Sequence, residues 1–224
     1  MHIFTGEGLS CLSSPSSPPR LEMISGTGFA LRETVVLVSV ALTWEGPVGP
    51  GAFPDDPLIF ETLCEAGVYL RVKTYENGRL VAYAGQSVSL LARFDQHLSA
   101  MMALASPLRD ATGAVVFSGD AGARMVAYGA LDQIAPVAAA DASRVQFWFA
   151  QCDSYFHTEH LNLVEGLLQR RIAERLTDVE NINAAPGAPP DDIPDVWEND
   201  LSGLDEAGRV LLGRLLGDAA MTLG

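Results

Sequence analysis

The chain has 224 residues, of which 48% are hydrophobic and 19% are charged, so its composition excludes a disordered protein and allows one sizeable core. The net charge of −14 argues against extensive contact with nucleic acid, but the charge is unevenly spread. Residues 177–224 carry 10 acidic and 2 basic side chains, whereas residues 61–176 carry 12 and 10. The acidity therefore belongs mainly to the tail, and the middle of the chain is nearly neutral.

The N-terminal part is expected to lie outside the main domain. Residues 1–25 are rich in Ser and Pro and predict a flexible leader, and residues 26–57 form an extension. The apolar run 35–42 is about half as long as a membrane span, so we interpret it as a buried strand. Three cysteines without close pairing favour a reducing, cytoplasmic compartment and predict no disulfide framework.

A β-hairpin follows, with the arms GVYLRVKTY and RLVAYAG on either side of the turn residues Asn77 and Gly78. A two-residue loop, which local preference favours, would place Tyr69 and Tyr83 on opposite faces of the hairpin. A three-residue loop with Gly78 in the left-handed region pairs Arg71 with Tyr83 instead. We adopt the three-residue loop on functional grounds, because four side chains then share one face: Tyr69, Arg71, Lys73 and Tyr83.

The next element is predicted to be a helix capped by Ser87 or Ser89. Its apolar residues recur at helical spacing: Leu90, Leu91, Phe94, Leu98, Met101 and Met102. Arg93 and His97 are four residues apart and therefore neighbours on one flank of this helix.

Two further elements are predicted beyond an Ala- and Gly-rich stretch. Residues 144–152 indicate a strand, and residues 160–176 indicate a helix. The buried stripe of that helix is expected to contain Leu161, Val164, Leu168 and Ile172. Glu165 lies at the edge of this stripe, where a carboxylate is disfavoured unless it is paired or binds a cation.

Residues 184–224 predict an acidic Pro- and Gly-rich linker followed by a short helix. We expect this helix to dock on the core through Trp197 and a set of apolar residues: Leu204, Val210, Leu211 and Leu215. The alternative is an acidic tail that serves as a surface for a partner or mimics DNA.

The order and spacing of these motifs resemble the GIY-YIG nuclease family. The resemblance lies in Gly67-Val68-Tyr69, in Tyr83-Ala84-Gly85-Gln86-Ser87 and in the helix carrying Arg93 and His97. It implies an α/β (α+β) fold with a small, mainly antiparallel three-stranded sheet flanked by helices, over residues 58–183. Residues 102–144 would be an insertion that decorates this domain and contributes to substrate recognition.

The resemblance also implies roles for individual residues. Five side chains are candidates for catalysis: Tyr69, Tyr83, Arg93, His97 and Glu165. Five residues are candidates for binding the substrate: Arg71, Lys73, Gly85, Gln86 and Asn183, with Asn181 as an alternative to Asn183. We expect Tyr69, Tyr83, Arg93 and Glu165 to converge on one face.

The chemistry of phosphodiester hydrolysis suits these residue types. Glu165 would anchor Mg²⁺ or Mn²⁺, and Arg93 would hold a phosphate oxygen. Tyr69 could accept a proton only if cations lowered its pKa, and Lys73, the only lysine of the chain, could supply that charge. His97 is the rival proton acceptor.

The sequence thus predicts a divalent-metal-dependent endonuclease acting on DNA, without a membrane partner. Cutting both strands with one site per chain would require a homodimer or two successive nicks, and the scarcity of basic residues suggests a basic partner subunit as another option. The competing hypothesis is a catalytically inactive GIY-YIG-like module that binds nucleic acid or protein.

Overall fold

The computed structural model describes residues 39–50, 57–175, 179–183, 196–217 and 220–222. The elements that carry the candidate residues follow one another in the order β1 (Ser39–Thr43), β2 (Glu45–Val48), α1 (Pro57–Cys64), β3 (Gly67–Thr74), β4 (Leu80–Ser87) and α2 (Leu90–Met102). The second half contains β5 (Leu108–Arg109), β6 (Val115–Phe117), α3 (Ala121–Tyr128), α4 (Leu131–Ala142), β7 (Val145–Gln151), a 3₁₀ turn (Thr158–His160), α5 (Leu161–Arg175), β8 (Val179–Asn181), β9 (Val196–Asp200) and α6 (Glu206–Leu216). The expected leader (1–25), residues 35–38 of the expected strand and the linker 184–195 lie outside the described residues.

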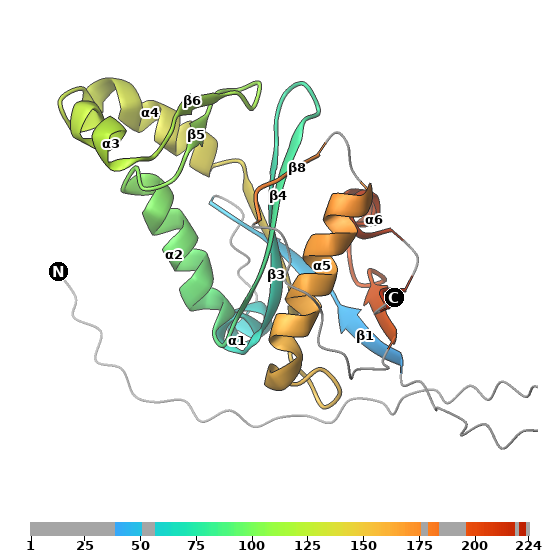
Figure 1. Ribbon diagram of the computed structural model, residues 1–224. Helices are drawn as coiled ribbons and strands as arrows, with labels where there is room; N and C mark the ends of the chain where they lie inside the picture. Colours follow the sequence, from blue (N-terminus) through green and yellow to red (C-terminus); the bar gives the residue numbers. More distant parts are fainter. Residues whose placement is uncertain (1–38, 51–56, 176–178, 184–195, 218–219, 223–224) are drawn as a thin grey trace, which may run out of the picture.

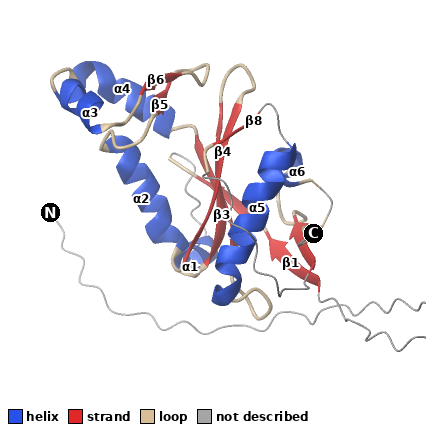
Figure 2. Cartoon of the chain, in the orientation of Figure 1, coloured by secondary structure: helices blue, strands red, loops and turns tan. Residues whose placement is uncertain are grey.

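The central sheet has five strands in the order β2-β7-β3-β4-β8 (Figures 1 and 2). Strand β3 pairs antiparallel with both β4 and β7, whereas β8 pairs parallel with β4. The mixed α/β class is confirmed, but the expected three-stranded sheet is too small. β2 comes from the presumed N-terminal extension and adds to the β7 edge, so that extension is partly built into the sheet. Short strands such as β8 give too few residues for a periodic signal.

The hairpin has the three-residue loop. Thr74 pairs with Leu80 and Arg71 with Tyr83, and Gly78 has a φ of 78°. The tip is also held by the insertion, because the Glu76 amide donates to the carbonyl of Ala111 at 3.1 Å. This long-range support explains why the longer loop forms although local preference favours the shorter one.

The two faces of the sheet carry different helices (Figure 1). Even-numbered residues of β3 and β4, such as Leu70 and Ala84, pack with α5 and α6 in the larger core. Odd-numbered residues, such as Tyr69 and Tyr83, lie on the other face against α1 and α2. Strand alternation therefore separates a structural face from a face rich in polar groups.

Both flanking helices follow the predicted patterns. Ser89 caps α2, since its side chain accepts a hydrogen bond from the Ala92 amide, and Leu90, Phe94 and Met101 are buried. Met102 belongs to the predicted set of apolar helix positions, but its side chain is 57% exposed because α2 ends there. In α5 the whole predicted stripe is buried, namely Leu161, Val164, Leu168 and Ile172.

The insertion, residues 102–144, has its own small apolar cluster but is tied to the sheet by buried charge. Asp141 of α4 is fully buried and accepts hydrogen bonds from Lys73 Nζ at 2.5 Å and from Tyr75 Oη at 2.9 Å. Arg109 of β5 bonds to Glu180 of β8, which also binds Arg79. These pairs fix the insertion beside the hairpin.

The C-terminal helix docks on the core as expected. Trp197 lies in β9, which pairs parallel with β1, and its side chain is fully buried together with Leu204 and Leu215. Val210 was predicted to face the core, but it is 63% exposed, because Leu212 and Leu216 occupy the buried side of α6. Within the described residues, no helix is both long enough and apolar enough to cross a membrane.

Candidate active site

Four of the predicted catalytic side chains meet on the α2 face of the sheet. The rings of Tyr69 and Tyr83 stack with their centroids 6.0 Å apart, and the His97 ring lies edge-on at 5.4 Å from each. Arg93, one turn before His97, donates from Nε to Tyr69 Oη at 3.0 Å. Three elements, β3, β4 and α2, thus place aromatic and cationic groups around one phenol oxygen.

The partners of His97 determine its tautomer. Arg71 Nη1 lies 3.0 Å from His97 Nδ1, and a guanidinium can only donate, so Nδ1 is the acceptor. A neutral imidazole then carries its proton on Nε2, which donates to Tyr69 Oη at 2.7 Å. Tyr69 Oη therefore accepts from both His97 and Arg93, and it also shares a hydrogen bond with the Tyr83 side chain, which raises the pKa of Tyr69.

Burial controls the ionisation of this cluster. It lowers the pKa of His97 to about 3, and the charges of Arg71 and Arg93 act in the same direction, so the imidazole is neutral at ordinary pH. Burial also raises the pKa of Tyr69, while the hydrogen bond and charge of Arg93 lower it only in part. Tyr69 is therefore a phenol in this state, held by donors that would also stabilise a phenolate.

Gly85 has a steric role here. It pairs with Tyr69 across the hairpin, and a Cβ on Gly85 would collide with the hydroxyl end of the Tyr69 ring. The glycine lets the phenol lie flat across β4 and reach His97. Gly85, a predicted substrate contact, is thus a residue that positions Tyr69.

Glu165 approaches from the opposite side of the sheet. It belongs to α5, and its Oε1 accepts from Gln169 Nε2 at 3.0 Å; the same amide group lies 3.4 Å from the carbonyl oxygen of Ala84. Glu165 thus reaches the edge of β4 beyond the point where β8 stops pairing. The expectation that all four residues share one face is wrong for Glu165, because α5 covers the other face.

Glu165 is nevertheless in electrostatic contact with the tyrosine cluster. Its half-buried position raises the pKa of the carboxyl group, and the charge of Arg93 opposes that rise. Arg93 therefore couples the tyrosines electrostatically to the carboxylate.

Glu165 is the residue of this neighbourhood that could contribute a carboxylate to a divalent-cation site. Among the residues that the structure describes, no three His, Cys, Asp or Glu side chains gather into a ready-made cage. Mg²⁺ commonly keeps several waters and binds proteins through one or two carboxylates together with substrate phosphates. Glu165 could supply one such carboxylate.

The structure gives Arg71 and Lys73 different environments. Arg71 lies over the Tyr83 ring, 5.3 Å from its centroid, as well as bonding to His97. Lys73 shares the face as predicted, but its ammonium binds Asp141. The cations beside Tyr69 are therefore Arg71 and Arg93, and Lys73 does not fill the charge-supplying role expected for it.

Asn183 and Gln86 lie at the α5 side of β4. The Asn183 side chain accepts from the Ala84 amide at 2.8 Å and donates to the Ala84 carbonyl, so it continues the pairing of β8 along the strand edge. Asn181, the alternative candidate, donates to the carbonyl of Gln169 at 3.3 Å. Gln86 makes a 3.4 Å contact with Asn162. Asn183, predicted to bind substrate, thus caps a strand edge.

Two residues of this neighbourhood were missed in the sequence. Phe147 of β7 stacks beneath Tyr69, with ring centroids 4.6 Å apart, and Gln169 bridges Glu165 to β4. Phe147 is one aromatic residue in an aromatic strand, and Gln169 is a common helix residue four positions after Glu165. Only the strand register and the helix orientation single them out.

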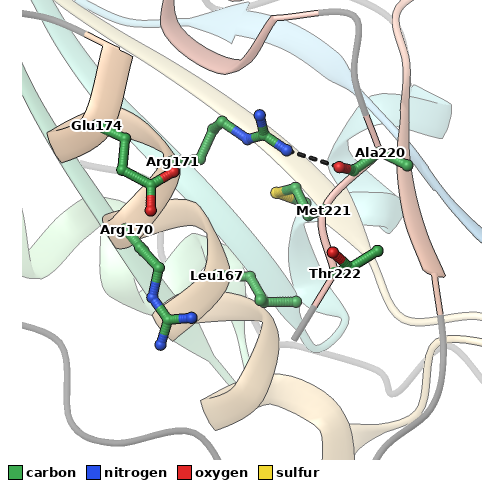
Figure 3. A pocket seen from close by; sticks show the side chains of 7 residues that line it. All are labelled: Leu167, Arg170, Arg171, Glu174, Ala220, Met221 and Thr222. Atoms are coloured by element: carbon green, nitrogen blue, oxygen red, sulfur yellow. Dashed lines mark hydrogen bonds between the residues drawn. The ribbon is translucent and has the colours of Figure 1, made fainter. Parts of the chain in front are cut away.

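Two hollows in the described part of the chain differ in character. One, about 250 Å³, lies between α5 and the segment 220–222 and includes Arg170, Arg171 and Glu174 (Figure 3). Arg171 there donates to the carbonyl of Ala220 at 2.7 Å. It contains none of the predicted site residues. The other, about 220 Å³, adjoins the tyrosine cluster through Arg71.

Comparisons with protein-family models, with curated proteins and with solved structures found no match for this chain. Function is therefore inferred from the geometry of these side chains and from the sequence motifs.

Proposed function

We propose that the chain is a GIY-YIG-like endonuclease that hydrolyses DNA phosphodiester bonds with a divalent metal. One observation carries the proposal: Arg93 bonds to the Tyr69 hydroxyl while its charge acts on Glu165. Arg93 of α2, which would hold a phosphate, thus connects Tyr69 of β3 with Glu165 of α5. Tyr69 would handle a proton, and Glu165 would anchor a cation.

The side chains have complementary roles in this reaction. Arg93 would hold a non-bridging phosphate oxygen through those N–H groups that do not bond to Gln96, Tyr69 or Tyr83. Tyr69 would act as a phenolate, after losing its own proton to solvent, and would take a proton from the attacking water to return to the neutral phenol. His97 Nε2–H and Arg93 Nε–H would stabilise the phenolate before that transfer, and Tyr83 would orient the phosphate or the water.

Glu165 would hold Mg²⁺ or Mn²⁺, sharing the ion with waters and a phosphate oxygen of the substrate. When bound, such an ion stabilises charge on the phosphate and lowers the pKa of water. The raised pKa of Glu165 is consistent with a carboxylate whose negative charge a bound cation would stabilise.

A binding module remains the second candidate, favoured by the net charge of −14 and by the raised pKa of Tyr69. The deciding experiment incubates the protein with plasmid and with branched or flapped DNA, in Mg²⁺ or Mn²⁺ and in chelator. Metal-dependent cutting that disappears in the Arg93→Ala variant supports the nuclease. Binding without cutting on every DNA would favour the module.

A further inference from the structure

The hollow beside Arg71, here called the basic cavity, continues the surface of the candidate site along β3 and β4. Arg71 and Lys73 project into it from β3, and Lys73 pairs with Val81 just as Arg71 pairs with Tyr83. Successive residues on one face of a strand are about 7 Å apart. The basic cavity thus begins one such step from Tyr69, toward the hairpin tip.

Three cationic side chains line the basic cavity: Arg71, Lys73 and Arg109. Their carboxylate partners, Asp141 and Glu180, bond to Lys73 and Arg109 but are not part of the lining. Arg71 and Arg109 both lower the pKa of Lys73, although burial is the larger cause, so the three charges lie within electrostatic reach of one another. Lys73 and Arg109 are thus already paired with carboxylates, whereas Arg71 bonds to the neutral His97 and keeps its full positive charge at this hollow.

The other walls of the basic cavity are apolar. Val81, Met101 and Ile182 face the same space of about 220 Å³. An anion alone would gain nothing from these side chains, whereas a sugar or a base can pack on them. Cations on one side and apolar groups on the other match a phosphate joined to a nucleoside.

We propose that the basic cavity binds one nucleotide of the substrate strand, adjacent to the nucleotide whose phosphate is cut, with its phosphate on Arg71, beside the carboxylate-paired Lys73 and Arg109. This inference rests on the proposed function and adds a subsite to it. The subsite fixes the strand with few contacts, which a protein poor in basic residues requires. It also directs the bound DNA strand along β3 toward the tip of the β3–β4 hairpin.

The test uses thymidine 5′-monophosphate as the probe, with thymidine and inorganic phosphate as comparisons. Ile182, 39% exposed, is replaced by glutamate to put a negative charge in the cavity wall, and Val210→Glu on α6 is the matched control with the same added charge. Ser106→Asp adds a charge from another lining residue, in case the first variant is poorly folded. Melting temperature is measured with each probe, and cleavage of a short oligonucleotide duplex gives KM and kcat.

We expect millimolar thymidine 5′-monophosphate to raise the melting temperature of the parent and of Val210→Glu, more than phosphate or thymidine does. The shift should be lost in Ile182→Glu and in Ser106→Asp. KM for the oligonucleotide should rise about tenfold in both variants, which corresponds to about 1.4 kcal/mol, while kcat changes less than about twofold.

The outcomes separate the subsite from the nuclease. An absent shift in the parent, or an equal shift in the parent and both cavity variants, overturns the subsite even if the parent cuts DNA. A cavity-dependent shift in a parent that cuts no DNA keeps the nucleotide site and removes the nuclease proposal.

Discussion

At the scale of single residues, Arg93 acts on two groups that come from different faces of the sheet. Its guanidinium bonds to the Tyr69 hydroxyl, where it would stabilise a phenolate, and its charge acts on the carboxylate of Glu165. Losing Arg93 should therefore weaken DNA binding and cutting together. Losing Glu165 should act on chemistry alone, which makes the pair a sharp test of the assignment.

The first prediction concerns Glu165→Gln. The amide keeps the shape of the side chain but cannot neutralise a bound cation, so we expect kcat in Mg²⁺ to fall on the order of a thousandfold, about 4 kcal/mol. Affinity for DNA in chelator should stay equal or rise slightly, because a negative charge near the phosphates is gone. Rapid-quench cleavage and fluorescence anisotropy measure the two quantities.

Glu174→Gln is the matched control, since Glu174 lies on the same helix at the other hollow. It should cut at the parent rate. An undiminished rate in Glu165→Gln would remove Glu165 from the mechanism.

The second prediction concerns pH. Tyr69 acts as a base only as the phenolate, and its raised pKa keeps this form scarce but increasing with pH. Log kcat should therefore climb with a slope of about 1 between pH 6 and 9. If His97 were the base, its pKa of about 3 would give a flat profile over that range. Tyr69→Phe should slow cleavage by about a hundredfold or more and abolish the slope, whereas Tyr83→Phe should keep the slope. A slope that survives in Tyr69→Phe would assign the proton to another acceptor.

At the scale of elements, the insertion depends on one buried ion pair. Lys73 of β3 and Asp141 of α4 are both buried, and Tyr75 bonds to the same carboxylate. A buried pair is costly to break on one side, because the remaining charge is unpaired, but it can often be replaced as a unit by apolar groups. The pair therefore specifies where α4 sits on the hairpin more than it adds stability.

The third prediction is a double-mutant cycle on this pair. Asp141→Leu alone should lower the free energy of unfolding by about 3–5 kcal/mol, since it leaves the Lys73 ammonium buried without its carboxylate. Adding Lys73→Met should recover most of that loss. Urea unfolding followed by circular dichroism measures both. Additive losses in the double variant would show that the two side chains are not coupled.

The elements also show where prediction from sequence stops. The Asn-Gly turn and the alternating arms predicted β3 and β4, and the spacing of leucines predicted α5, because these signals are local. The Lys73–Asp141 pair, the cap that Asn183 places on β4 and the contact of α5 with β4 through Gln169 depend on segments that are distant in the sequence. No local pattern encodes them. Four of the five proposed catalytic residues could be placed on one face from sequence, but the side from which the fifth arrives could not.

At the scale of the whole molecule, charge limits how the protein can hold nucleic acid. The described basic residues nearest the candidate site are few, and the chain as a whole repels phosphates. The fourth prediction is therefore a shallow dependence of DNA affinity on salt, with a slope of log affinity against log salt on the order of −2 to −4. Titrations from 50 to 300 mM KCl would measure it. A slope steeper than about −6 would mean that a basic partner or another surface dominates binding.

The parallel pairing of β1 with β9 has a consequence for folding during synthesis on the ribosome. Ser39 lies opposite Val196, so the partner of β1 is synthesised only after residues 44–195. Until then Leu42 and Trp44, which are buried in the finished fold, lack a cover supplied by the last part of the chain. The hairpin and α2 can form while synthesis continues, because their contacts are local. Closure of the larger core must wait until β9 and α6 have been synthesised, so the face that carries Tyr69, Tyr83, Arg93 and His97 can be assembled before the structural face is closed.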